Sequence, residues 1–254
     1  MLSAYCTDVG NVKKVNQDAL LIMEAALDSG SLMFAAVCDG MGGLLNGEHA
    51  STVLTDALGK WFREEAVLSA ASGMTRREMI DSLNRTILSV DSSLYSYSRS
   101  KGDCGTTLTG LILCRGRYLC VNVGDSRAYR MNSGGITQIT RDQTVVQQML
   151  DRGEISEKEA KTHPDQSVLL QCVGAGKEVV PDYTWGTYDD ADLFLLCSDG
   201  FRHKVTGKEI YKALYPSVQM TEEGMGRLLR DMTEKIKARK ERDNLTAILI
   251  AAKE

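Results

Sequence analysis

Short apolar runs and longer amphipathic stretches follow one another along this chain, and they predict strands and helices respectively. A strand shows apolar residues in a continuous run or in alternation, whereas a helix shows them at every third or fourth position. By this criterion we expect strands at residues 2–9, 19–25, 32–38, 106–114, 117–124, 126–131, 136–139, 182–188, 192–197 and 245–251. We expect helices at residues 46–66, about 75–98, 144–152, 156–161, 206–214 and 221–240.

The two helices predicted in the first half of the chain have clear signatures. In the first, Leu54 and Leu58 are among apolar residues that recur at helical spacing. Before the second, Thr75 and Glu78 have the spacing of a capping box, in which each side chain binds the backbone N–H of the other residue. Small residues from Ser69 to Gly73 predict a break between the two helices.

The helices come in pairs between groups of strands, rather than singly after each strand. A doubly wound parallel sheet requires the single alternation of strand and helix, so this order argues against that fold. It favours antiparallel sheets that pack together, with pairs of helices on their outer faces. Because the sequence has no internal repeat or linker, we expect one domain over residues 1–254, with a polar insertion at about 141–180.

Composition limits the classes of protein to which the chain can belong. Its 254 residues are 43% hydrophobic and 25% charged, which suits a full core and argues against disorder. The net charge of −4 argues against nucleic acid as a partner. The sequence shows neither a membrane-spanning run nor a signal peptide, and its seven cysteines, mostly in apolar runs, indicate reduced core thiols. We therefore expect a cytoplasmic monomer that binds neither nucleic acid nor membranes.

Two of the predicted strands end in the same acidic turn. The run 32–38 is followed by Asp39–Gly40, and the run 195–197 leads through a serine into Asp199–Gly200. A strand holds a carboxylate rigidly, and glycine lets backbone carbonyls come close to a ligand. An ordinary Asp-Gly turn is the simpler interpretation of either motif alone, but the repetition favours a metal site where the two strand ends meet.

Five acids lie near glycine or asparagine at the ends of strand-like segments: Asp18, Asp39, Asp125, Asp199 and Asp243. Any one of them alone is more simply interpreted as a solvated acid. Five in equivalent places are harder to explain in this way, because crowded carboxylates repel one another unless cations lie between them. Without cysteine or histidine ligands, such a cluster favours Mg²⁺ or Mn²⁺ over Zn²⁺. Two such ions roughly 3.5–4 Å apart can acidify a water and stabilise an in-line attack on phosphorus.

Other catalytic groups are poorly represented. His49 falls in a predicted helix, His163 precedes a proline, and only His203 lies close to an acidic motif. The sequence has no Gly-x-Ser-x-Gly elbow and no Cys-x₅-Arg phosphate loop, so a metal-activated water is favoured over covalent catalysis. Lys13 and Lys14, between the first two strands, could hold a phosphate, although exposed turn lysines are the simpler interpretation.

Motifs along almost the whole chain add up to a family resemblance. The matching pieces are, in order, Thr7–Gly10, Asn16–Asp18, Asp39–Gly43, Gly47–Glu48, Ala50–Ser51, Cys104–Thr107, Val123–Tyr129, His163–Pro164, Cys197–Gly200 and Asp243–Thr246. Each motif is weak by itself, but the ordered set is specific. The sequence resembles the metal-dependent protein serine/threonine phosphatases known as PP2C or PPM, in their compact bacterial form.

The resemblance implies an α+β fold, a four-layer αββα sandwich in which two antiparallel β-sheets are flanked by paired helices. The residues that it implies as metal ligands are Asp18, Asp39, the Gly40 carbonyl, Asp125, Asp199 and Asp243. Two Mn²⁺ or Mg²⁺ ions would form the core, and Asp39 would touch both. Asp18 would join directly or through water, and Asp125 with Asp199 would help to hold a third, weaker ion. Asp39, Asp199 and Asp243, with Lys13 on the phosphate, would be the catalytic residues.

The resemblance also implies a reaction and its partners. A water or hydroxide bridging the two ions would hydrolyse phosphoserine and phosphothreonine on proteins, without a covalent intermediate, and would oppose a Ser/Thr kinase. The insertion at 141–180 would be a mobile flap beside the active site. Two alternatives remain: a non-catalytic relative that binds phosphoproteins or regulates, and a hydrolase of small phosphate esters. Loss of a core aspartate would have favoured the first alternative, but all the core aspartates are present.

Four positions depart from the pattern of the family. Lys13 stands where arginine is usual, which keeps the charge but loses the bidentate fork. Gln17 is neutral where many members have glutamate, and Met41 replaces a histidine proposed as general acid, so that leaving-group protonation would fall to a metal-bound water. His203 replaces an acid that helps to hold the third ion, which puts that ion, but not the two-ion core, in doubt.

Overall fold

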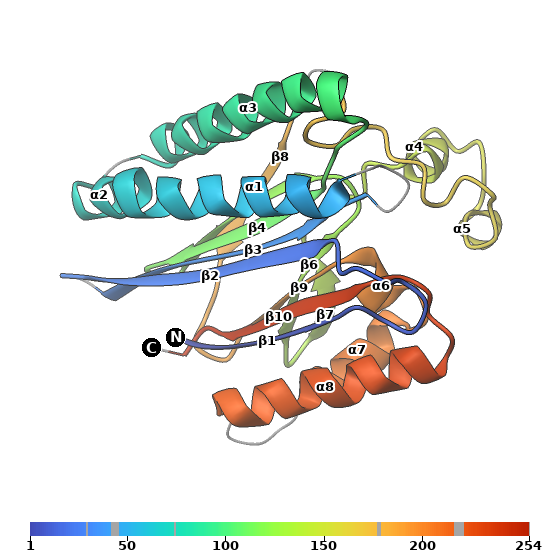
Figure 1. Cartoon of the computed structure of the whole chain (residues 1–254). Helices are drawn as coiled ribbons and strands as arrows, with labels where there is room; N and C mark the ends of the chain where they lie inside the picture. Colours follow the sequence, from blue (N-terminus) through green and yellow to red (C-terminus); the bar gives the residue numbers. More distant parts are fainter. Residues whose placement is uncertain (29, 42–45, 74, 177–178, 216–220, 254) are drawn as a thin grey trace.

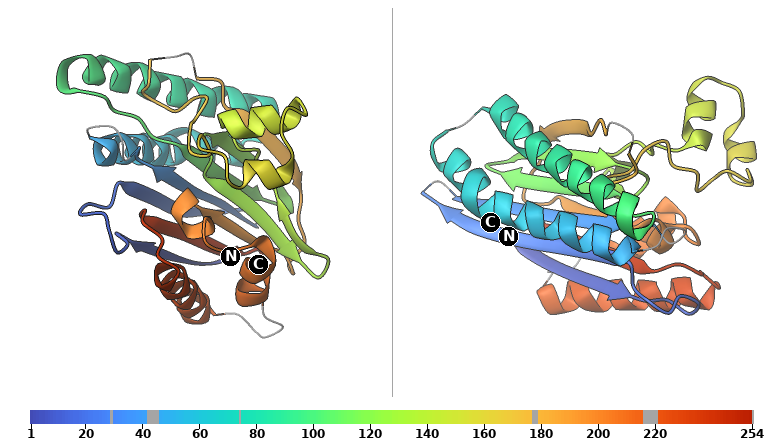
Figure 2. Two further views of the ribbon diagram at one scale, coloured as in Figure 1. Left: turned by 90° about the vertical axis from the view of Figure 1, so that its right-hand side faces the viewer. Right: turned by 45° about the horizontal axis from the view of Figure 1, so that its top comes forward.

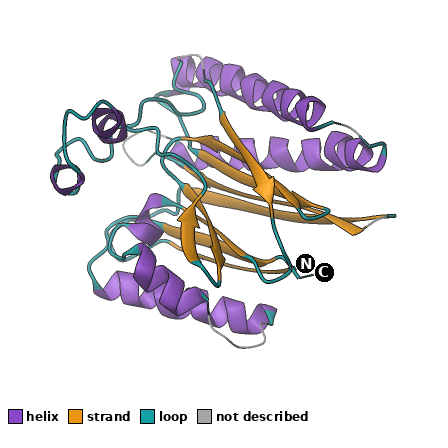
Figure 3. Ribbon diagram, turned by 180° about the vertical axis from the view of Figure 1, so that it is seen from behind, coloured by secondary structure: helices purple, strands orange, loops and turns teal. Residues whose placement is uncertain are grey.

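Two antiparallel sheets lie face to face between layers of helix (Figure 1). The computed structural model describes residues 1–28, 30–41, 46–73, 75–176, 179–215 and 221–253. Within these ranges each sheet has five strands. Seen from behind in Figure 3, the strands form the middle of the molecule and the helices lie outside them.

The first sheet contains the longest strands of the described chain. In spatial order its strands are β2 (Asp18–Leu27), β3 (Gly30–Asp39), β4 (Leu108–Cys114), β5 (Arg117–Val123) and β8 (Asp182–Thr187). Strand β3 is almost continuously apolar because both of its faces are buried: Phe34 packs toward the helices, and Met33 and Ala35 pack toward the other sheet. This is the strand that carries Asp39 at its end.

The second sheet joins segments from the two ends of the chain. In spatial order its strands are β1 (Leu2–Asp8), β10 (Leu245–Ala251), β9 (Leu193–Cys197), β6 (Arg127–Asn132) and β7 (Gly135–Gln138). Strand β10 is fully buried between β1 and β9, with Leu2 opposite Ala251 and Asp8 opposite Leu245. The last strand of the sequence is therefore central to its sheet.

Pairs of helices cover the outer faces of the sheets. The helices are α1 (Gly47–Trp61), α2 (Val67–Ala71), α3 (Arg76–Lys101), α4 (Val145–Asp151), α5 (Glu157–Ala160), α6 (Asp199–Arg202), α7 (Gly207–Leu214) and α8 (Glu222–Ala238). Helices α1 and α3 lie on the first sheet, whereas α7 and α8 lie on the second (Figure 1). The predicted capping box opens α3: Glu78 N donates to Thr75 Oγ1 at 3.3 Å, and Thr75 N donates to the Glu78 carboxylate at 2.8 Å.

Three apolar cores correspond to the three contacts between the four layers. One core joins the first sheet to α1 and α3, with Phe34, Leu58 and Ile87 completely buried. Another joins the second sheet to α7 and α8. The third lies between the sheets and includes Phe194 and Ile248. The predicted α+β, four-layer sandwich with two antiparallel sheets is confirmed.

The helix boundaries differ from the sequence prediction in two places. The first helix does not break at Ser69, because a π-helical turn (Phe62–Ala66) carries it on into α2. The short helix α6 was not predicted, since its four residues are too few to show a helical period. It begins at Asp199, so the acid of the second Asp-Gly motif lies in the first turn of a helix.

The polar insertion at about 141–180 lies to one side of the layers. It contains α4 and α5, as the two predicted helical stretches require, and both project beyond the ends of the sheets (Figure 2). Figure 1 places the insertion above α6, at the end of the sheets where the predicted acids lie. Among the described residues, none of the helices is long and apolar enough to cross a membrane.

Candidate active site

The five acids singled out in the sequence lie at one end of the two sheets. Asp18 opens β2 and Asp39 closes β3, and the antiparallel pairing places them opposite each other. Asp199 follows β9 and Asp243 precedes β10, and these two strands are neighbours. Asp125 lies just before β6, the other neighbour of β9. Each sheet therefore contributes acids to the same end of the sandwich.

One hydrogen bond joins the two halves of this acidic group. Ser198 Oγ donates to Asp18 Oδ2 at 2.9 Å, and the same hydroxyl accepts from Thr246 N at 3.1 Å. The other carboxylate oxygen, Asp18 Oδ1, is buried and has no hydrogen-bond partner among the described residues. A buried carboxylate oxygen without a partner is costly, so this atom is well suited to a cation or to a water held by one.

The acids raise one another's pKa because they are buried together. Burial raises the pKa of Asp18 to about 7; hydroxyls of Thr246 and Ser198 oppose the rise, and the charges of Asp199 and Asp243 add to it. Burial also raises the pKa of Asp39 well above its usual range, and the neighbouring carboxylates, Asp18 foremost, contribute. Divalent cations between these groups would remove the repulsion, so the electrostatics fit a metal centre.

The Asp39–Gly40 turn is held rigidly by backbone contacts. Gly40 N donates to Gln17 O at 3.1 Å, and Asp39 N donates to Thr107 Oγ1 at 3.0 Å. A Cβ at position 40 would lie 2.3 Å from Gly47 O and 2.6 Å from Gln17 O, so only glycine fits. The neighbouring Gly42 and Gly43, which the sequence assigned to the same motif, lie outside the described residues.

Asn244 fixes the other side of the site, a role that the sequence did not reveal. Its Nδ2 donates to Val9 O at 2.9 Å and to Val15 O at 3.1 Å, and its Oδ1 accepts from Gln17 N at 2.9 Å. The turn between β1 and β2 is thereby fastened to the start of β10. The sequence signal was its place in the Asp243–Thr246 motif, directly after Asp243, which does not predict such distant partners.

Lys13 faces the acids, whereas Lys14 is exposed. The ammonium of Lys13 lies 2.8 Å from Asp243 Oδ1. Burial alone would lower the pKa of Lys13, but the hydrogen bond and charge of Asp243, with smaller contributions from Asp39 and Asp199, raise it. A cation that stays charged at the rim of an anionic site can pair with a phosphate oxygen. This position favours the binding interpretation for Lys13 over that of a solvated turn lysine.

Asp125 is in a different situation from the other four acids. Burial raises its pKa to about 7, the charge of Asp199 adds to the rise, and the Arg202 guanidinium opposes it. Arg202 Nη2 lies 3.2 Å from Asp125 Oδ2. His203 Nε2 lies 3.4 Å from Asp199 Oδ2. Of the two acids of the implied third site, Asp125 is the one that has no place in the core, and it is already paired with a largely buried guanidinium, which does not fit a further cation at this oxygen.

The core acids fit ions that keep part of their water shell. In the described parts of the chain, no three His, Cys, Asp or Glu side chains come together closely enough to enclose an ion by themselves. Mg²⁺ and similar hard ions are commonly held by one or two carboxylates, with waters and other oxygens completing the shell. Asp18 Oδ1, Asp39, the Gly40 carbonyl, Asp199 and Asp243 are donors of this kind.

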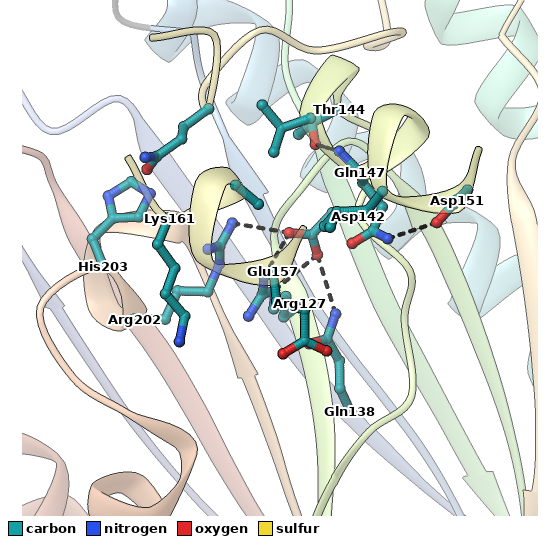
Figure 4. A pocket seen from close by; sticks show the side chains of 14 residues that line it. Arg127, Gln138, Asp142, Thr144, Gln147, Asp151, Glu157, Lys161, Arg202 and His203 are labelled. Atoms are coloured by element: carbon teal, nitrogen blue, oxygen red, sulfur yellow. Dashed lines mark hydrogen bonds and ion pairs between the residues drawn. The ribbon is translucent and has the colours of Figure 1, made fainter. Parts of the chain in front are cut away.

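A cavity of about 720 Å³ opens beside the acids, between the insertion and α6 (Figure 4). Its lining residues include Arg127, Asp142, Gln147, Lys161, Arg202 and His203. In Figure 4, Gln147 and Asp151 of α4 lie on one side of this view, and Arg202 and His203 lie on the other. Arg202 and His203 connect the cavity to the acids, since they contact Asp125 and Asp199, respectively.

Comparison with known protein families and sequences gives consistent matches. The model of the family described as "Protein phosphatase 2C" matches residues 11–249. The chain is 31% identical over 217 residues to the serine/threonine phosphatase stp of Listeria monocytogenes serotype 4b (strain F2365), which covers 84% of this chain and 83% of that protein.

Solved structures are similar over nearly the whole chain. The crystal structure of the serine/threonine phosphatase Stp1 from Staphylococcus aureus is 32% identical, with a TM-score of 0.84 over 99% of this chain and 95% of that one. The catalytic domain of the serine threonine protein phosphatase PstP, in complex with 2 manganese ions, is 28% identical, with a TM-score of 0.75 over 97% of this chain and 96% of that one.

Proposed function

Because the chain belongs to the protein phosphatase 2C family and is a metal-dependent serine/threonine phosphatase, we propose that it removes phosphate from phosphoserine and phosphothreonine on proteins with two Mn²⁺ or Mg²⁺ ions. Their ligands would be Asp39, the Gly40 carbonyl, Asp199 and Asp243, with Asp18 acting directly or through water. The observation that carries this proposal is the convergence of buried, mutually repelling carboxylates from both sheets.

The cations supply Lewis acidity when bound, since they lower the pKa of a water and neutralise phosphate charge. The remaining roles belong to the side chains of the chain itself. Without substrate, the Lys13 ammonium contacts Asp243. When substrate binds, Lys13 contacts a phosphate oxygen instead. Ser198 holds Asp18 in the orientation that leaves Oδ1 facing the site. Thr107 holds the backbone of Asp39.

Water is the attacking group in this proposal, and no covalent intermediate forms. The thiol nearest to the acids in sequence is Cys38, and burial raises its pKa far above the usual range, with Asp18 and Asp39 adding to the effect. A thiol that stays protonated is a poor nucleophile. Met41, which is next to Gly40, has no proton to give, so the leaving group takes its proton from water.

The wider role follows from the substrate class. A phosphatase specific for phosphoserine and phosphothreonine reverses the work of a Ser/Thr kinase, and we propose such a kinase as the opposing partner. The insertion at 141–180 would act as a flap that contacts the polypeptide around the phosphorylated residue, which the cavity beside it supports.

A single assay tests the activity and its site. Purified protein would receive a phosphothreonine peptide with Mn²⁺ or with EDTA, and phosphate release would be measured. We expect release only with Mn²⁺. Asp199→Ala should lose at least roughly 100-fold, the upper end of the loss seen when only a group supporting a metal ligand is removed. Asp190→Ala is the matched control, because Asp190 is an exposed acid before β9 rather than after it.

The outcomes separate the three candidate functions. Absence of Mn²⁺-dependent release would refute the phosphatase proposal, and peptide binding without release would favour a non-catalytic relative. Faster turnover of p-nitrophenyl phosphate than of every phosphopeptide would favour a hydrolase of small esters. Equal activity of Asp199→Ala and the parent would refute the assignment of the site.

A further inference from the structure

The short helix α6 brings two basic side chains close to the acids. Asp199 opens the helix, Arg202 is three residues later and His203 four residues later. Side chains three and four apart lie on the same face of a helix, so both point back toward Asp199. The turn is closed by His203 N, which donates to Asp199 O at 3.0 Å. Neither side chain is itself a proposed ligand of the two core ions, although His203 Nε2 lies 3.4 Å from Asp199 Oδ2.

Arg202 binds Asp125 through one nitrogen of its guanidinium, Nη2. Its Nη2 donates to Asp125 O at 2.9 Å and to Asp125 Oδ2 at 3.2 Å. The side chains are only 12% and 7% exposed, respectively, so little water competes for this contact. The guanidinium occupies Asp125 Oδ2, so a cation at this oxygen would have to displace it.

A second ion pair locks Arg202 in place (Figure 4). Arg202 Nη2 also lies 3.4 Å from Asp142 Oδ2, and Asp142 accepts two hydrogen bonds from Arg127, at 2.8 Å from Nε and 2.7 Å from Nη2. Asp142 thus contacts both guanidinium groups, and Arg202 joins Asp142 to Asp125. A divalent ion added at Asp125 Oδ2 would lie against the positive charge of the Arg202 guanidinium.

The structure assigns to Arg202 the place of a third cation: this phosphatase works with the two core ions, and the guanidinium supplies the positive charge at Asp125. His203 occupies Asp199 from the same helix turn. Arg202 is thus a positioning residue that connects Asp125 to Asp142 at the start of the insertion. This inference rests on the proposed function for the core ions, and it departs from the sequence-based expectation of a third, weaker ion.

The test counts bound Mn²⁺ by equilibrium dialysis into the millimolar range, which does not depend on activity. Asp125→Asn should bind as many ions as the parent. The double variant Arg202→Ser/His203→Asp should gain one ion, and adding Asp125→Asn should remove it again. Arg77→Ser is the matched control, since its side chain is 91% exposed on α3 and its loss changes the net charge by the same amount as Arg202→Ser.

Each outcome decides the inference. If the parent binds an ion that Asp125→Asn loses, Arg202 does not take the place of a third cation, and the inference is overturned. If the double variant folds with an unchanged thermal transition but gains no ion, the two side chains are not what closes the site, which also overturns it. The core ions are counted separately with Asp39→Asn. If this variant binds as many ions as the parent, the proposed function is contradicted. The comparison of Asp125→Asn with the parent still decides this inference.

Discussion

Replacement of Asn244 by alanine should weaken both the fold and the metal centre. The side chain is 3% exposed, and its three hydrogen bonds join Val9 O, Val15 O and Gln17 N to the start of β10. At about 1 kcal/mol each, their loss lowers the free energy of unfolding by about 3 kcal/mol. For a chain of this size, that corresponds to a fall of roughly 6–12 °C in melting temperature.

The effect on metal binding follows from the next contact in the chain. Gln17, held by Asn244 through its N–H, accepts a hydrogen bond from Gly40 N through its carbonyl at 3.1 Å. Loosening Gln17 therefore displaces the Gly40 carbonyl, a proposed ligand. We expect Asn244→Ala to need about tenfold more Mn²⁺ for half-maximal activity, as is usual when a group supporting a ligand is removed.

The assay is urea unfolding of the metal-free protein by circular dichroism, followed by an Mn²⁺ titration of activity. A stability change of the expected kind shifts the midpoint and leaves the slope unchanged. Asn11→Ala is the control, because Asn11 is an exposed asparagine in the same turn with one hydrogen bond, to Lys237 O at 3.2 Å. If Asn244→Ala is no more destabilising than Asn11→Ala, the reasoning from the buried hydrogen bonds is wrong.

Two further predictions concern charge at the site. Lys13→Ala should raise KM for a phosphopeptide by about tenfold, since the ammonium next to Asp243 is lost. Lys14→Ala is the control and should leave KM unchanged. Steady-state kinetics measures both values, and equal effects would contradict the role of Lys13. Asp18 and Asp125, with pKa values raised from 3.8 to about 7, hold their protons more tightly when folded, so the metal-free protein should lose stability as pH rises through this interval. Melting curves in EDTA should show a shallower fall for Asp18→Asn than for the parent, and parallel curves would refute the buried-acid explanation.

Periodicity was enough to predict the layers, because each strand and long helix carries its own pattern. The run at 32–38 is apolar throughout since β3 is buried on both faces, and the capping box at Thr75 marks the start of α3 by local chemistry alone. The strand-end acids were equally visible. The structure places them together because β2 pairs with β3, and β9 lies next to both β10 and β6.

Contacts set by strand register were out of reach of the sequence. Arg202 meets Asp125 across 77 positions, and Asn244 meets Gln17 across 227. Periodicity in the sequence cannot predict contacts over such separations, because they depend on which strands become neighbours in a sheet. The sequence drew attention to His203 and not to Arg202, because helix α6 was too short to predict. In the structure, Arg202 has the closer contact with a candidate metal ligand.

The pairing of β1 with β10 has a consequence for the synthesis of the enzyme on the ribosome. Strand β1 is made before every other described strand, but its only described neighbour in the sheet is β10, which comes last among them in the sequence. Asp243 and Asn244, at the entrance to β10, arrive equally late. A nascent chain that stops before them lacks both a proposed ligand and the side chain that fastens the β1–β2 turn. A nascent chain should therefore be inactive until β10 has been made as far as residue 251.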